Sequence, residues 1–119
     1  DQNKAVAFAN LFLHPNPRLA HKGEISLGVA SAYQAMGLGR KMMEAIIRVA
    51  EDWMGLQRLE LTVLSQNLAA QELYRSLGFV EEGRYRCSLG YQGAYSDELA
   101  MARILPPPQA GPGKDSSVG

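Results

Sequence analysis

The sequence predicts one α/β domain with a mixed, mostly antiparallel central sheet and helices packed on it. Two observations predict this class. Segments with strand character and segments with helical periodicity follow one another in the order strand, strand, helix, strand, helix, strand, strand. The chain has 119 residues, of which 46% are hydrophobic, so it is long and apolar enough to form one core.

The first predicted strand is the apolar run 5–13. It ends at residues 14–17, where two prolines remove backbone donors. The polar residues 1–4 before it are typical of a hairpin turn, so the sequence is expected to begin in the middle of a fold. The second strand, 24–29, alternates polar or small residues with apolar ones, which indicates one buried face.

A helix is expected over 38–54, because apolar residues recur there at helical spacing and form one stripe. The stripe consists of Leu38, Met42, Ile46, Val49 and Trp53. Gly55 is placed to end this helix as a cap residue. Met43, like Met42 and Trp53, is predicted to pack in the core.

The segment 58–64 alternates in the manner of a strand, with leucine and valine on one face and Glu60 and Thr62 on the other. Asn67 follows and suits an N-cap, since its side-chain oxygen can accept from first-turn N–H groups. A helix over 68–77 is expected to end at Gly78.

The last two strands are expected at 79–89 and 95–104. They flank a glycine-rich turn over 90–93, so they should pair antiparallel. Residues 106–119 are rich in proline and glycine and are predicted to form a disordered tail. The domain is therefore expected to occupy residues 1–105.

Composition excludes several classes of protein. The 12 basic residues are balanced by 12 acidic ones, so no nucleic-acid partner is expected. No apolar run reaches the roughly 20 residues of a membrane span, and no signal peptide is visible. The single cysteine, Cys87, fits a reducing, cytoplasmic location and a plain strand residue better than a nucleophile. His14 and His21 lack further ligands nearby, so no metal is expected.

A glycine-containing segment joins the second strand to the first helix. It consists of Gln34, Ala35, Met36, Gly37, Leu38, Gly39 and Arg40. Glycines let a backbone turn tightly, and a helix start adds unpaired N–H donors and the positive end of the helix dipole. Such a segment can bind a phosphate, although a plain helix-entry turn is the alternative.

The chain resembles the GNAT superfamily of acetyl-CoA-dependent N-acetyltransferases over residues 1–105. The family's acyl-CoA motif, Gln/Arg-x-x-Gly-x-Gly/Ala between a strand and a helix, is matched by Gln34, Gly37 and Gly39. Its second motif is matched by Asn67, Ala70, Leu73, Tyr74, Gly78 and Phe79. The residues 82–84 and 97–101 also look like the bacterial branch that acetylates amino acids and related small amines.

The resemblance implies a binding site for acetyl-CoA as co-substrate. Backbone N–H groups of residues 35–40 would bind the pyrophosphate, and Arg40 would either meet a phosphate or stay solvated. The strand end formed by Leu27, Gly28 and Val29 would pair with the pantetheine arm. The N–H at Val29 would stabilise the developing oxyanion. Asn67 would hydrogen-bond the cofactor arm or a bridging water, in addition to capping its helix.

The resemblance also implies two catalytic side chains. Tyr74 would protonate the leaving thiolate, because a phenol pKa of about 10 lies close to that of a thiol. The alternative for Tyr74 is an ordinary helix aromatic. Glu24 is the candidate general base, acting directly or through water, since Thr62 cannot accept a proton at neutral pH. Glu24 as a solvent-facing strand residue, with water alone as the base, remains the alternative.

The expected function is transfer of an acetyl group to the primary amine of a small molecule or an amino acid. Family members normally have a strand and two helices before the hairpin that Asp1 enters, so an N-terminally truncated or partial domain is expected. The alternative is a truncated module that binds CoA or self-associates, as a homodimer, without turnover. A nucleotide-phosphate site is disfavoured, because neither a P-loop Lys-Ser/Thr nor an acidic ribose partner follows the glycines.

Overall fold

The structure is a computed structural model that describes residues 6–30 and 36–105. The turn predicted at 1–4, the glycine-segment residues Gln34 and Ala35, and the disordered tail predicted at 106–119 lie outside these ranges. Those three expectations therefore stay predictions.

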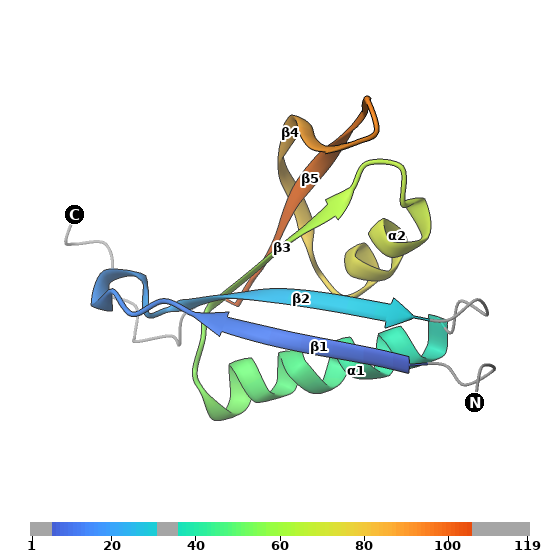
Figure 1. The fold of residues 1–119 in the computed structure, drawn as a ribbon. Helices are drawn as coiled ribbons and strands as arrows, with labels where there is room; N and C mark the ends of the chain where they lie inside the picture. Colours follow the sequence, from blue (N-terminus) through green and yellow to red (C-terminus); the bar gives the residue numbers. More distant parts are fainter. Residues whose placement is uncertain (1–5, 31–35, 106–119) are drawn as a thin grey trace.

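The elements follow the predicted order, with two short helical turns added. They are β1 (Val6–Leu13), the 3₁₀ turn η1 (Pro17–Leu19), β2 (Lys22–Ala30), α1 (Met36–Arg48), the π-helical turn η2 (Val49–Trp53), β3 (Arg58–Leu64), α2 (Leu68–Ser76), β4 (Val80–Tyr91) and β5 (Ala94–Ile104). Figure 1 shows α1 running along β1 and β2, with α2 beside the end of β3.

The described strands form one sheet in the order β1-β2-β3-β5-β4. Every neighbouring pair is antiparallel except β2 and β3, which are parallel. The α/β class with a mixed, mostly antiparallel sheet is therefore confirmed. Insertion of β5 between β3 and β4 means that residues on β3 and β4 can meet only by reaching across β5.

The core lies on one face of the sheet. On β3, Leu59, Leu61 and Val63 are buried, with exposed fractions of 0%, 4% and 6%, as the alternating pattern predicts. They belong to one cluster that also contains side chains of α1 and α2. Both helices therefore cover the same face, and the other face of the sheet is open to solvent among the described residues.

The stripe predicted for the first helix is confirmed in part: Leu38, Met42 and Ile46 are half-buried, but the most buried positions lie one residue later. Met43, Ile47 and Ala50 are buried, whereas Val49 is 46% and Trp53 82% exposed. The chain leaves the α-helix after Arg48 and enters the π-helical turn η2. A π-turn inserts an extra residue, so spacing that assumes an α-helix loses its phase there. Trp53 is consequently not a core residue.

The predicted caps are confirmed. The Asn67 side-chain oxygen accepts the N–H of Ala70 at 3.1 Å, and Gly55 and Gly78 have positive φ directly after helical segments. The turn predicted at 90–93 is shorter than expected. Only Gln92 and Gly93 separate β4 from β5, and both have positive φ, as a tight two-residue hairpin turn requires.

Arg103 ties three elements together on the helical face. From β5, its Nε donates to Glu51 of η2 at 2.7 Å, and its Nη1 donates to the carbonyl of Leu77 at 2.6 Å. The Glu51 side chain is only 8% exposed, and its hydrogen bond raises the pKa of Arg103. One guanidinium thus satisfies a nearly buried carboxylate and the carboxyl end of α2.

Candidate functional site

The backbones of β2 and β3 separate partway along the sheet. They pair at only three positions, Lys22–Glu24 with Arg58–Glu60, although the strands have nine and seven residues. Beyond these pairs the strands diverge, as Figure 1 shows. This divergence between residues 25–30 and 61–64 is called the wedge below. Backbone groups on both sides of it lack a partner strand, which leaves them able to pair with a bound extended ligand.

The groups that face the wedge from β3 follow from the strand register. The Ser65 N–H donates to the Asp97 carbonyl at 2.9 Å, so Ser65 points its backbone groups toward β5. Successive residues of an antiparallel pair point these groups to alternate sides. Those of Thr62 and Leu64 therefore point into the wedge.

The described part of the glycine segment forms the start of α1, the element that follows β2 in the chain. Met36, Gly37, Leu38, Gly39 and Arg40 all lie in the first turns of α1. Gly37 is exposed, and a Cβ there would meet nothing within 4 Å, whereas Gly39 is buried. The first of the two glycines thus keeps the helix start open to a ligand, as the phosphate-binding hypothesis needs.

A cavity of about 510 Å³ lies between the start of α1 and the outer face of α2. Its lining residues are Gly37, Arg40, Ala69, Glu72, Leu73 and Ser76. Arg40 Nη2 donates to Ser76 Oγ at 2.8 Å, and that hydroxyl donates to the Leu73 carbonyl at 2.7 Å. Arg40 therefore lies against α2, which holds its positive charge beside the helix start rather than free in solvent.

Tyr74 is a buried residue of α2, with an exposed fraction of 7%. Its ring packs against Phe79 with the centroids 6.0 Å apart, and it shares the core cluster with Leu61 and Val63 of β3. Burial raises the pKa of the Tyr74 phenol, so the hydroxyl keeps its proton at neutral pH. A general acid has to be in this protonated state. Asn67, at the start of the same helix, acts as the N-cap, and its contact with the cofactor stays a prediction.

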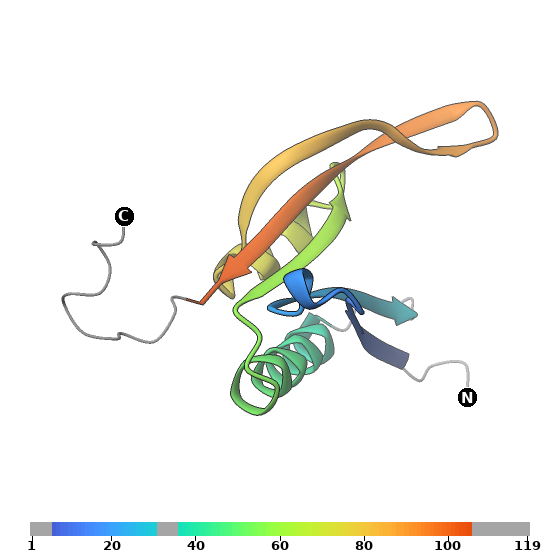
Figure 2. The ribbon, with the colours of Figure 1, turned by 90° about the vertical axis from the view of Figure 1, so that its left-hand side faces the viewer.

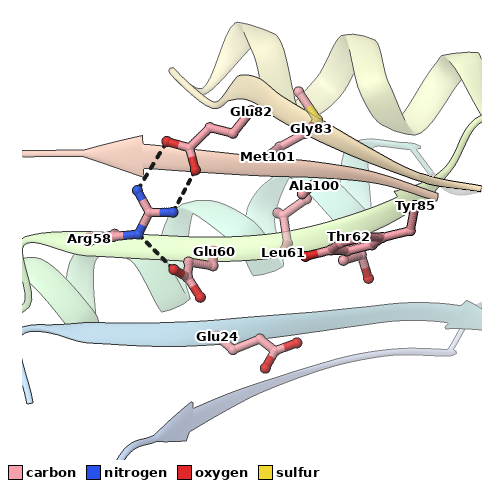
Figure 3. A pocket seen from close by; sticks show the side chains of 10 residues that line it. All are labelled: Glu24, Arg58, Glu60, Leu61, Thr62, Glu82, Gly83, Tyr85, Ala100 and Met101. Carbon is pink, nitrogen blue, oxygen red and sulfur yellow. Dashed lines mark hydrogen bonds and ion pairs between the residues drawn. The ribbon is translucent and has the colours of Figure 1, made fainter. Parts of the chain in front are cut away.

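Glu24 lies at the last paired position of β2 and β3, opposite Glu60 and just before the wedge. It lines a second cavity of about 510 Å³, drawn in Figure 3. The lining residues are Glu24, Arg58, Glu60, Leu61, Thr62, Glu82, Gly83, Tyr85, Ala100 and Met101. This cavity places Glu24 and Thr62, the two side chains weighed as bases, in one site.

Arg58 holds the other two carboxylates of this cavity. Its Nε donates to Glu60 Oε2 at 2.6 Å, and its Nη1 and Nη2 donate to the two oxygens of Glu82 across β5 (Figure 3). Lys22 Nζ lies 3.5 Å from Glu60. The hydrogen bonds to Arg58 lower the pKa of Glu82. For Glu60, burial acts to raise the pKa but is outweighed by Arg58 and Lys22, so its pKa is also lowered.

These pairings distinguish Glu24 from its neighbours. Glu60 and Glu82 are ionised and already accept hydrogen bonds from Arg58, which makes them poor proton acceptors. Among the residues that the structure describes, Glu24 forms no ion pair and no side-chain hydrogen bond. It is therefore the carboxylate of this cavity that is free to meet a substrate.

Sequence reasoning missed the ion network of Arg58, Glu60 and Glu82, and also missed Gln71. The spacing of Arg58 and Glu60 on one strand face was a usable signal. Nothing in the sequence placed Glu82 beside them, because that contact depends on the order of the strands. Within residues 6–30 and 36–105, no three His, Cys, Asp or Glu side chains gather as metal ligands, and no helix is long and apolar enough to cross a membrane.

Comparison with known proteins finds acetyltransferases. The family model described as "Acetyltransferase (GNAT) family" matches residues 1–79. The chain is 28% identical over 99 residues to the L-amino acid N-acetyltransferase AaaT of Escherichia coli (strain K12), which covers 83% of this chain and 61% of that protein.

Two solved structures agree with this match. An acetyltransferase of the GNAT family from Streptococcus pneumoniae is 30% identical with a TM-score of 0.77, over 83% of this chain and 60% of that one. The acetyltransferase yncA from Salmonella typhimurium, solved with acetyl-CoA, is 26% identical with a TM-score of 0.76, over 90% and 62%. The chain thus spans between 60% and 62% of the length of these proteins. With its wedge and its helix-entry glycines, the chain belongs to the GNAT acetyltransferase family.

Proposed function

We propose that this chain transfers an acetyl group from acetyl-CoA to the primary amine of a small molecule or an amino acid. The observation that carries the proposal is the wedge, which opens between β2 and β3 after three paired positions. Along the chain, the β2 side of the wedge leads to the start of α1, and Glu24 lies where the two strands separate. The Salmonella neighbour was solved with acetyl-CoA as its cofactor, and the name of the Escherichia coli relative gives L-amino acids as its substrates; both support the proposal.

The residues present fit acetyl-CoA. Leu27, Gly28 and Val29 pair with β1 on one edge, and their backbone groups on the edge that faces the wedge would pair with the pantetheine arm, as an added strand pairs with a sheet edge. The N–H groups from Met36 to Arg40, with the charge of Arg40 held beside them, would bind its pyrophosphate. Gln34 and Ala35 are proposed to extend this cradle. When bound, acetyl-CoA supplies a thioester whose acetyl carbon is open to attack by an amine.

The chain's own groups then handle the protons. Glu24 would accept a proton from the incoming ammonium, directly or through one water, and so yield the neutral amine. The Val29 N–H would donate to the carbonyl oxygen as negative charge grows there. As the new C–N bond forms, the nitrogen would release its second proton to solvent, and as the C–S bond breaks, the Tyr74 hydroxyl would donate its proton to the departing sulfur. Solvent would then reprotonate the Tyr74 phenolate.

The decisive test of donor binding is calorimetric titration of this chain with acetyl-CoA. We expect micromolar binding that Gly37→Asp abolishes, because a carboxylate at the helix start repels phosphate and neutralises the positive potential of the helix N-terminus. Gly37→Ala is the matched control, since the space around a Cβ at this position is open. It should bind as the unchanged chain does.

Equal binding by the Asp and Ala variants would remove the glycine segment from the site. A complete lack of binding by the unchanged chain would contradict the enzyme proposal for these 119 residues.

A second candidate function is a module that self-associates or holds CoA without turnover. It is favoured by the edge of the sheet, where β1 pairs only with β2 among the described strands. Phe8 and Phe12 are 50% and 55% exposed on this strand. An unpaired edge with exposed aromatic side chains favours pairing with another copy of the chain.

We also propose a cytoplasmic location. Cys87 is an exposed free thiol on β4, outside both cavities. A reducing compartment keeps such a thiol from forming disulfides between molecules.

A further inference from the structure

Gln71 is the one buried polar side chain among the residues that the structure describes, with an exposed fraction of 4%. It lies on α2. Its Nε2 donates to the carbonyl of Leu64 at 3.1 Å and to the carbonyl of Ser65 at 3.0 Å. A glutamine amide has two N–H donors, so both are used on the end of β3.

The Leu64 carbonyl lies at the mouth of the wedge, whereas Ser65 follows β3 and its N–H points toward β5. Leu64 is the last residue of β3, and its backbone groups point to the side from which β2 has diverged. Its carbonyl therefore has no strand to pair with. The carbonyl accepts instead from the backbone N–H of Asn67 at 3.0 Å and from Gln71 Nε2. Gln71 thus adds a side-chain bond from the interior of α2 to the backbone bond that Asn67 makes at the start of the helix.

Gln71 and Tyr74 lie on the same side of α2, because residues three apart in a helix are neighbours on its surface. Both are buried. Whatever fixes Gln71 against the end of β3 therefore fixes the position of the Tyr74 ring relative to the wedge. Asn67 ties the start of the helix to β3, because its N–H donates to the Leu64 carbonyl at 3.0 Å, whereas its side-chain cap acts within the helix.

We propose that Gln71 is a positioning residue that acts through Tyr74, by holding α2 at the distance from β3 at which the phenol reaches the reacting sulfur. This inference rests on the proposed function, in which Tyr74 is the acid. Small displacements of a catalytic group lower rates strongly, so loss of the Gln71 bonds should reduce kcat while leaving the binding of acetyl-CoA nearly unchanged.

The kinetic test is a double-mutant cycle on the full chain. Gln71→Met keeps the length of the side chain but removes both donors, and we expect it to lower kcat by about tenfold or more with KM for acetyl-CoA nearly constant. In the Tyr74→Phe background, the same change should have little further effect on kcat. Equal losses of kcat in the two backgrounds would overturn the proposal. Gln66→Met, at an exposed glutamine of the preceding turn, is the control and should leave kcat unchanged.

A spectroscopic test needs no turnover. The chain is labelled with 3-fluorotyrosine. The ¹⁹F resonance of Tyr74 is assigned as the one that is lost in the Tyr74→Phe variant. Gln71→Met should shift and broaden this resonance and leave those of the other tyrosines in place, whereas Gln66→Met should move none. An unshifted Tyr74 resonance in folded Gln71→Met would overturn the proposal.

Gln71→Glu is a second variant that keeps the proposal testable if Gln71→Met does not fold. A protonated glutamic acid can still donate one hydrogen bond, so the Tyr74 resonance should return toward its normal position as pH falls. If it stays displaced at every pH, Gln71 does not act through its donors. If Tyr74→Phe leaves kcat intact, the acid role of Tyr74 fails, and the ¹⁹F spectra alone decide whether Gln71 positions the ring.

Discussion

Glu24 shows that a residue's chemistry depends on the partners of its neighbours. The cavity on the open face of the sheet contains three glutamates, yet Arg58 binds two of them. Those two are held as anions and are structural. Glu24, one strand away, forms no ion pair and no side-chain hydrogen bond with the described residues. The three glutamates therefore differ because Arg58 reaches two of them and Lys22 adds to its effect on Glu60.

We predict that Glu24→Gln lowers kcat/KM for the amine by about 10²-fold or more, because an amide cannot accept the ammonium proton. The rate should be measured against pH, and the variant should lose the limb on which activity rises with pH. Glu44→Gln, at an exposed position of α1, is the matched control. An unchanged profile in Glu24→Gln would mean that water alone accepts the proton.

The Arg58 network should make stability depend on pH. The pKa values of Glu60 and Glu82 are lowered from an ordinary value of 4.5 in the folded protein. Their contribution to folding is therefore present above pH 4.5 and is lost as pH falls through the lowered values. We expect Arg58→Met to flatten the fall in stability below pH 4.5, measured by urea unfolding at stepped pH. A fall as steep as in the unchanged chain would contradict this.

At the scale of elements, periodicity and caps predicted most of the fold. The strand 58–64 matches β3, and Asn67, Gly55 and Gly78 end or begin helices as expected. The exposure of Val49 and Trp53 could not be predicted, because the π-helical turn η2 has no clear sequence signal. The glycine segment and Tyr74 each lie within one segment and could be proposed from the sequence, whereas the contact of Arg58 with Glu82 depends on the order of the strands in the sheet.

The ion pair of Arg103 with Glu51 should stabilise the packing of the helices on the sheet. Glu51→Gln or Arg103→Met alone should each lower the free energy of unfolding by about 2 kcal/mol, because each leaves a partly buried charge without its partner. The double variant should lose less than the sum of the two. Urea unfolding of the four proteins measures this coupling, and strictly additive losses would show that the pair does not interact.

Among the described residues, the sheet has one face that α1 and α2 cover and one face that is open to solvent. In Figure 2, the β4–β5 hairpin extends well beyond α1 and α2. The aromatic side chains of Phe8 and Phe12 are exposed on β1, and that of Tyr95 is 67% exposed on β5. The relatives are longer than this chain, so the two faces need not be equally exposed in them.

We predict that this chain self-associates through β1. Gel filtration with light scattering should give a mass above 13.0 kDa, with a dimer as the expected species. Phe12→Lys should shift the population to monomer, because it places a charge on the edge strand. Tyr95→Lys, on the distant hairpin, should have no such effect. A single monomeric peak from the unchanged chain would rule this out.

The parallel seam between β2 and β3 also has a consequence for how the chain folds. The β4–β5 hairpin joins residues that are close in sequence, so its closure costs little chain entropy. The seam joins Lys22–Glu24 to Arg58–Glu60, which are separated in sequence by the whole of α1 and η2. Only three residue pairs offset the entropy lost when this long loop closes. We therefore expect it to form late, with two separately nucleated halves of the sheet meeting there last. On this expectation, the proposed acyl site lies on the contact that forms last.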